Sequence, residues 1–216
     1  MRSRKFEYDS TMASHIFVHS QEYDDLGQLE VGEELLTVQN HVFSQIGVLE
    51  CDGVRAMESD WIDDEAYIDV FCDVGSGVGN VCVQVLADVR NCRKVVGVEV
   101  IPSRHNRAVE AIGRARRSYP HLFTLEKEAV FLNCDLVGCA PRLNSEKVTV
   151  LFSHSWMFDD DLMEKFSVLV KECPALRMVI TSRPLVHSDG FELSKTTHYS
   201  TDWNPECPFY VYRRTI

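Results

Sequence analysis

The architecture of the chain follows from one segment, Phe71-Cys72-Asp73-Val74-Gly75-Ser76-Gly77-Val78-Gly79-Asn80. An apolar, β-branched run leads into it from Tyr67, and an apolar stretch follows from Val81 to Val89. A strand, a glycine turn and a helix N-terminus form the usual nucleotide-binding corner of a doubly wound sheet. Glycine suits such a turn because it reaches positive φ and lets a ligand approach the backbone. The segment therefore predicts an α/β fold with a nucleotide-type ligand at this corner.

The spacing of the glycines narrows the class of ligand. A dinucleotide site has the pattern G-x-G-x-x-G, whereas this chain has Asp73-x-Gly75-x-Gly77-x-Gly79, with an acid before the first glycine. This spacing disfavours an NAD-binding oxidoreductase. It resembles motif I of S-adenosylmethionine (AdoMet) methyltransferases. A tight turn in another kind of α/β protein is the alternative explanation.

A second acid supports a ribose-binding corner. Lys94 to Val100 is expected to be the next buried strand, and its Glu99 comes twenty residues after Gly79. An acid at this distance from the glycine turn typically accepts hydrogen bonds from the ribose hydroxyls. A carboxylate suits this role because it is an acceptor only and takes two donors at once. The alternative is an ordinary surface glutamate at a strand end.

Length and composition limit the possible size, location and partners of the protein. The 216 residues suit one domain, and 45% apolar residues suffice for a sizeable core. We expect no membrane span, because no apolar run approaches ~20 residues, and no secretory signal is visible. The eight cysteines form no C-x-x-C pair, so we expect neither a metal site nor disulfides, as in a cytosolic or nuclear protein. The net charge of −11 disfavours a nucleic-acid coat and suits a basic partner such as a histone, although solubility alone also explains it.

The remaining elements follow from periodicity and turn residues. A polar arm is expected up to about Gln28, followed by a helix from Leu29 to Gly47. Arg104 to Tyr119 is a basic helix, which is typical of a solvated face, with contact to a phosphate backbone as the alternative. The other expected elements are strands over 125–136, 148–152 and 177–182, a helix over 159–170, and a terminal hairpin over 191–199 and 209–213 with its turn at 203–206.

The core motif resembles a known family. Phe71 to Gly79, followed by Gly97-Val98-Glu99 and Ile101-Pro102, closely resembles the Dot-one (disruptor of telomeric silencing) histone-lysine N-methyltransferases, which are not of the SET type. Their motif is D-L-G-S-G-V-G, then G-[IV]-E, then I-P. The Ser-Gly-Val-Gly core and the Ile-Pro pair are more specific than motif I in general.

Other segments extend the resemblance. Glu30-Val31-Gly32-Glu33 corresponds to V-Y-G-E, a loop that closes over the methionine part of AdoMet. Cys134-Asp135-Leu136 corresponds to G-D-F, whose acid meets the adenine. Ser182-Arg183-Pro184 corresponds to S-K-P. Trp203 and Tyr210 match a W-x6-Y spacing in which the tyrosine lines the lysine channel.

The resemblance implies a class I AdoMet-methyltransferase (Rossmann-like) α/β sheet with helices on both faces, a terminal β-hairpin and a small N-terminal helical cap. Residues 1–60 would be the arm and cap, and residues 61–216 the methyltransferase domain. It also implies S-adenosyl-L-methionine as cofactor, a nuclear location, and the nucleosome or a core histone as partner, with possible indirect DNA contact. The expected product is a methylated lysine on the core surface of histone H-three.

The resemblance also assigns site residues. The expected cofactor-binding residues are Val31, Gly32, Glu33, Asp73, Gly75, Ser76, Gly77, Gly79, Asn80, Glu99, Asp135 and Leu136. The expected catalytic residues are Tyr210, Ser153, His154 and Trp203. Tyr210, Trp203, Phe158 and Trp156 are candidates for an aromatic channel wall, with a buried structural role as the alternative for Trp156.

The sequence departs from the family pattern at three places. Val31 replaces a tyrosine, Asn80 replaces a glutamine, and Ser153-His154 replaces an N-N-F segment whose asparagine lies near the transferring methyl group. Ser153 or His154 would instead hydrogen-bond the lysine amine, and His154 is a candidate proton acceptor. The alternatives are an AdoMet methyltransferase acting on another protein and a non-catalytic AdoMet-binding scaffold.

Overall fold

The structure is a computed structural model, and it describes residues 69–89, 92–201 and 204–215. The predicted arm and cap helix of residues 1–60 lie outside the described residues. No helix in the described part of the chain is long and apolar enough to cross a membrane. The same residues contain no cluster of three or more His, Cys, Asp or Glu side chains that would hold a metal ion.

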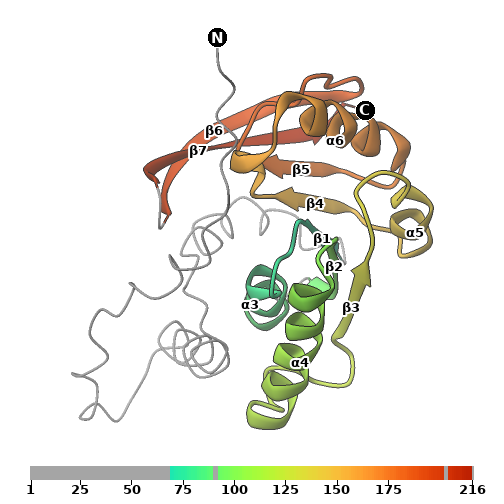
Figure 1. Cartoon of the computed structure of the whole chain (residues 1–216), viewed down its shortest axis with the longest axis vertical. Coiled ribbons are helices and arrows are strands. Elements are labelled where there is room, and N and C mark those ends of the chain that lie inside the picture. Colours follow the sequence, from blue (N-terminus) through green and yellow to red (C-terminus); the bar gives the residue numbers. More distant parts are fainter. Residues whose placement is uncertain (1–68, 90–91, 202–203, 216) are drawn as a thin grey trace.

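A single mixed sheet forms the centre of the molecule (Figure 1). The strand order is β3-β2-β1-β4-β5-β7-β6. The first five strands in this order are parallel, and β7 runs antiparallel between β5 and β6. The strands are β1 (Asp69–Val74), β2 (Cys92–Glu99), β3 (Glu128–Asn133), β4 (Val150–Ser153), β5 (Met178–Thr181), β6 (Phe191–Thr201) and β7 (Asn204–Arg214). The predicted α/β sheet with a terminal hairpin is confirmed.

Helices cover both faces of the sheet, as predicted. The described helices are α3 (Asn80–Asp88), α4 (Pro102–Ser118), α5 (Ala140–Ser145), α6 (Asp160–Glu172) and the 3-10 turn η2 (Ser155–Met157). One core packs α3 and α4 against the sheet, and a second core packs α5 and α6 against the other face. Alternate residues of β1 serve the two cores, because Phe71 belongs to the first and Cys72 and Val74 to the second.

The topology places a switch point, where open α/β sheets form their ligand crevice, at the carboxyl end of β1. This strand pairs with β2 on one side and with β4 on the other, so the crossover direction reverses there. Ligands of open α/β sheets bind outside the carboxyl ends of the strands at such a switch point. The glycine loop and Glu99 follow β1 and end β2 respectively, and both therefore border the crevice.

Some predicted boundaries were wrong. The strand predicted over 125–136 spans only Glu128–Asn133, and Leu125 before it is fully exposed. Helix α5 was not predicted, because six residues are too few to show a helical period. The hairpin turn predicted at 203–206 is displaced, since β7 already begins at Asn204 and pairs that residue with Thr201.

Replacing each of two glycines with alanine should change the free energy of unfolding in opposite directions. A Cβ at Gly97 would lie 2.5 Å from Cδ1 of Phe131 and 2.9 Å from Oγ of Ser76, so Gly97→Ala should lower the free energy of unfolding by roughly 2 kcal/mol. Within the described part of the chain, a Cβ at Gly113, inside α4, would meet only the flexible guanidinium of Arg117, at 3.6 Å. Gly113→Ala should therefore raise the free energy of unfolding by about 0.5–1 kcal/mol. Urea denaturation measures both, and equal effects would contradict the packing described here.

Candidate active site

The glycine loop is shaped by three residues with positive φ. Gly75, Gly77 and Gly79 have φ values of 83°, 56° and 87°, a region that favours glycine. The backbone N–H groups of Gly75 and Ser76 donate to the carbonyl oxygen of Val98 at 2.9 and 3.0 Å. These bonds fasten the loop to the end of β2. Helix α3 begins directly after the loop, so its N-terminus faces the crevice.

Glu99 holds the loop from the neighbouring strand. Its Oε2 accepts a 2.9 Å hydrogen bond from the backbone N–H of Gly77, and its Oε1 accepts a 2.8 Å bond from Ile101. The side chain is only 5% exposed. A carboxylate has about four acceptor positions, so two backbone donors leave capacity for ligand hydroxyls. Glu99 can therefore hold the glycine loop in place and bind a ligand at the same time.

A second buried carboxyl lies beside Glu99. Asp73, at the end of β1, is 3% exposed. Burial, and secondarily the nearby Glu99, raise the pKa of Asp73 from 3.8 to about 8. A carboxyl group with this pKa is mostly protonated at neutral pH. Asp73 keeps its proton and can donate a hydrogen bond.

Asp73 should make the protein less stable as the pH rises. Between its unfolded pKa of 3.8 and its folded pKa of about 8, the unfolded chain releases the proton and the folded chain keeps it. The free energy of unfolding should fall by about 1.4 kcal/mol per pH unit from this group alone. Asp73→Asn should remove that slope. In urea denaturation, the free energy of unfolding of the variant minus that of the wild type should therefore increase from about pH 5 to about pH 7. Parallel pH profiles would show that Asp73 ionises normally in the folded protein.

The loop leaves room for a ligand. A Cβ built at Gly77 would meet no atom of the described residues within 4 Å, and one at Gly75 would meet the ring of Phe158 at 3.8 Å. The hydroxyl oxygen of Ser76 is buried and has no hydrogen-bond partner among the described residues. An open cradle and an unpartnered hydroxyl are what a bound nucleoside would require.

Three of the remaining predicted cofactor residues lie in the described part of the chain. Asn80 is the first residue of α3. Asp135 is exposed, and its Oδ1 accepts a 3.1 Å bond from the backbone N–H of Val137, which is also the expected geometry of a turn residue. Leu136 is buried in the second core. The predicted residues Val31, Gly32 and Glu33 lie outside the described part of the chain.

Ser153 ends β4, and His154 follows it directly. Ser153 is fully buried, and its hydroxyl donates a 2.9 Å bond to the carbonyl oxygen of Val74. The ring of His154 stacks on Phe209, with centroids 5.6 Å apart, and its Nε2 lies 3.7 Å from Sγ of Cys207. Burial lowers the pKa of His154, which favours the neutral imidazole that can accept a proton.

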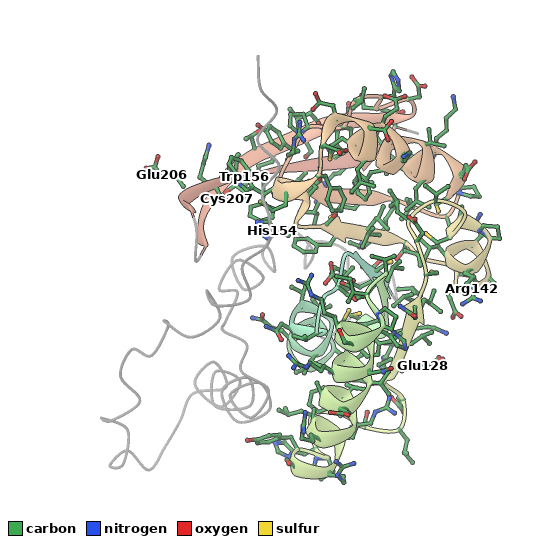
Figure 2. All side chains as sticks on the ribbon, viewed as in Figure 1. Glu128, Arg142, His154, Trp156, Glu206 and Cys207 are labelled. Atoms are coloured by element: carbon green, nitrogen blue, oxygen red, sulfur yellow. The ribbon has the colours of Figure 1, made fainter. Side chains whose placement is uncertain are left out.

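The aromatic candidates do not all gather on one face. Figure 2 shows His154, Trp156 and Cys207 near one another at one end of the sheet. Tyr210 lies opposite Thr181 on β5 and packs, like Phe158, against the second core. His154 contacts the first core instead, through Phe209. Trp156 is 41% exposed, which excludes a buried structural role; Trp203 lies outside the described residues.

Sequence reasoning missed two supporting side chains. Asn133 donates through Nδ2 to the carbonyl oxygen of Glu99 at 2.8 Å, which fixes the end of β2. Arg183 donates to the carbonyl oxygen of Phe158 and, at 2.7 Å, to Asp160, so it anchors the loop that carries Phe158 over the glycine turn. The signal for Asn133 was a polar side chain at a strand end, and Arg183 lay in the segment that corresponds to S-K-P, but neither residue was given this role.

Comparison with known proteins identifies the family. The family described as "Histone methylation protein DOT1" matches residues 64–201, which is more than half of the chain. The chain belongs to the DOT1 family. The predicted family is confirmed, and the matched range includes the glycine loop, Glu99 and His154.

A curated relative agrees with the DOT1 assignment. The "Histone-lysine N-methyltransferase, H3 lysine-79 specific" of Dictyostelium discoideum is 31% identical over 106 residues, which are 48% of this chain. The match spans only 6% of that protein's length.

Solved structures confirm the Rossmann-like fold of this DOT1 chain. TrmK of M. capricolum, solved with S-adenosyl-homocysteine, has a TM-score of 0.54 at 6% identity, covering 78% of this chain and 70% of that chain. A putative tRNA methyltransferase of Streptococcus pneumoniae has a TM-score of 0.55 at 12% identity, covering 77% and 71%. At such identities the likeness concerns the fold alone.

Proposed function

We propose that the protein is an AdoMet-dependent histone-lysine N-methyltransferase that acts in the nucleus on a core-surface lysine of histone H3. The single observation that carries the proposal is the DOT1 family match over residues 64–201, which includes an intact glycine loop and Glu99. The name of the Dictyostelium relative supports the choice of histone and lysine. The assignment of residues 1–60 to a cap and residues 61–216 to the methyltransferase domain belongs to this proposal.

The cradle at the glycine loop would hold the cofactor. When bound, AdoMet supplies a methyl group on a sulfonium. Glu99 would accept hydrogen bonds from the ribose hydroxyls, and Asp135 would accept one from the adenine amino group. The unpartnered hydroxyl of Ser76 and the open space at Gly77 suit a ligand that lies close to the backbone.

The remaining residues would prepare the lysine. A lysine amine has a reference pKa of ~10.4 and must lose its proton before it attacks a methyl group. An apolar channel of Tyr210, Phe158 and Trp156, with Trp203 as a further candidate, would favour the neutral amine by desolvation. Positioning then contributes more than covalent catalysis in an in-line transfer. His154, whose lowered pKa favours the neutral ring, would accept the proton.

One observation favours a second candidate, a non-catalytic AdoMet-binding scaffold. The hydroxyl of Ser153 already donates to the carbonyl oxygen of Val74 in a fully buried position. A serine held in this way would not hydrogen-bond a substrate amine without a rearrangement of β4. Under this alternative the cofactor would bind but no methyl group would move.

A transfer assay separates the two candidates. Labelled AdoMet should pass its methyl group to a core histone in recombinant nucleosomes, and less efficiently to free histones. His154→Ala should reduce the rate while AdoMet affinity, measured by calorimetry, stays unchanged. AdoMet binding without label on any histone would overturn the proposed activity and favour the scaffold.

A further inference from the structure

Helix α4 carries a concentration of positive charge on an acidic chain. Its 17 residues, Pro102–Ser118, contain one acid, Glu110, whereas the whole chain has a net charge of −11. The basic residues of the helix are Arg104, Arg107, Arg114, Arg116 and Arg117. Figure 1 shows α4 at the outer edge of the fold, on the side of the sheet that also carries α3.

Three of these arginines do not hold the fold together. The helix packs on the sheet through small side chains such as Ala108, Ala111 and Ala115, so its arginines are not required for packing. Arg114 lies 3.8 Å from Glu110, and Arg116 donates to the carbonyl oxygen of Lys127. Arg104, Arg107 and Arg117 are exposed and form no ion pair or hydrogen bond with any part of the chain that the structure describes. We call these three residues the arginine row.

The arginine row has the dimensions of a phosphate-binding surface. A rise of ~1.5 Å per residue separates Arg104 from Arg117 by roughly 20 Å along the helix. Duplex DNA carries a charge about every 1.7 Å of its axis, so a segment of this length offers several phosphates to the row. The guanidinium group suits them because its planar fork binds phosphate through two hydrogen bonds.

The composition of the helix surface favours DNA over an acidic protein. Protein interfaces have an apolar or aromatic centre. Within α4, all of which the structure describes, Val109 is the one large apolar side chain that is exposed. The other exposed positions near the arginine row include Ser103 and Asn106, whose short polar side chains also bind phosphate oxygens.

The helix also lies in the right place. It begins three residues after Glu99, so Arg104 and Arg107 occupy its first turns beside the candidate active site. Arg117 lies at the far end, near the amino edge of the parallel strands. DNA that followed α4 would pass next to the crevice and leave the carboxyl ends of β4 and β5 open to a protein substrate.

We propose that the arginine row of α4 binds the phosphate backbone of nucleosomal DNA and so orients the enzyme on its substrate. The identification of the DNA as nucleosomal rests on the proposed function, but the phosphate contact does not. The contact provides a polyanion-binding surface in a chain whose overall charge would repel DNA.

Salt-dependent DNA binding tests this proposal. Fluorescence anisotropy with a labelled DNA duplex measures how the logarithm of the affinity falls with the logarithm of the salt concentration. Each phosphate contact contributes ~0.9 to the slope of this plot. The slope of the triple variant Arg104→Gln, Arg107→Gln, Arg117→Gln should therefore be about 2.7 smaller in magnitude than that of the wild type. The control triple Arg93→Gln, Arg142→Gln, Lys171→Gln removes the same charge elsewhere and should keep the wild-type slope. Equal slopes for the two triples, or a wild type that does not bind the duplex, would overturn the proposal.

Two further readouts identify what the row contacts. If the row variant binds nucleosomes weakly but free DNA normally, the row meets an acidic histone surface, and the DNA proposal is wrong. Methyl transfer to free histone H3 should be unchanged in the row variant and reduced on nucleosomes. A wild type that transfers no methyl group, but whose DNA binding depends on the row, would refute the proposed function and leave the DNA contact intact.

Discussion

Replacing Glu99 with alanine should lower the affinity for AdoMet by about 100-fold or more. The change removes the acceptor for two backbone N–H groups, those of Gly77 and Ile101, and the proposed acceptor for the ribose. Hydrogen bonds to a charged group contribute about 1.5–3 kcal/mol each, so the loss of the ribose contacts alone accounts for this effect. Isothermal titration calorimetry measures the affinity directly.

A matched control separates charge from position. Glu128→Ala removes an acid that pairs with Lys94. Glu128 lies at the start of β3, far from the carboxyl edge of the sheet (Figure 2). This variant should bind AdoMet like the wild type. Glu99→Gln keeps one acceptor oxygen but turns a donor toward a backbone N–H. Its affinity for AdoMet should therefore lie between that of Glu99→Ala and that of the wild type. Normal AdoMet binding by Glu99→Ala would contradict the assignment of this residue.

Replacing Gly77 with alanine should weaken AdoMet binding by at least about tenfold, while the fold survives. The new Cβ would project into space where no atom of the residues that the structure describes lies within 4 Å, and this is the space that we assign to the cofactor. The φ of 56° adds roughly 1–2 kcal/mol of backbone strain. The strain alone would lower stability but would leave the cradle unobstructed.

Gly190 provides the matched control for strain. Gly190 lies in the loop before β6 with a φ of 77°, and the guanidinium of Arg214, at 3.7 Å, is all that its Cβ would meet among the described residues. Gly190→Ala should cost a similar free energy of unfolding and leave AdoMet affinity unchanged. If both variants bound AdoMet equally well, the cofactor would not lie against Gly77.

The elements nearest the glycine loop could be predicted because their signals are local. The strand, the turn and the helix are contiguous in sequence, and Glu99 follows at a spacing that one βαβ unit imposes. Secondary structure alone did not reveal that Asp73 lies beside Glu99 and holds its proton. That proximity depends on the pairing of β1 with β2.

The environment of the predicted catalytic residues depends on the order of the strands. His154 stacks on Phe209 because β7 is inserted between β5 and β6, and the sequence of a hairpin does not specify which of its strands joins the sheet. Tyr210, the next residue of β7, packs on the opposite face because side chains alternate along a strand. The roles of His154 and Tyr210 in methyl transfer remain predictions.

The short helix α5 and the role of Arg183 could not be predicted for a related reason. Helix α5 buries only Ala140 and Leu143, which is too little apolar periodicity to distinguish it from a loop. Arg183 contacts Phe158 and Asp160 from 23 to 25 residues away in sequence. Contacts of this kind arise only when the carboxyl ends of β4 and β5 are brought together.

The most direct test of the central claim is mass spectrometry of the core histones after incubation of nucleosomes with the enzyme and AdoMet. We expect histone H3 to gain the mass of one or more methyl groups on the side-chain nitrogen of a lysine on the nucleosome core surface. The Glu99→Ala variant, incubated in the same way, should leave the histone unmodified. Unmodified histones after incubation with a wild-type protein that binds AdoMet would contradict the account.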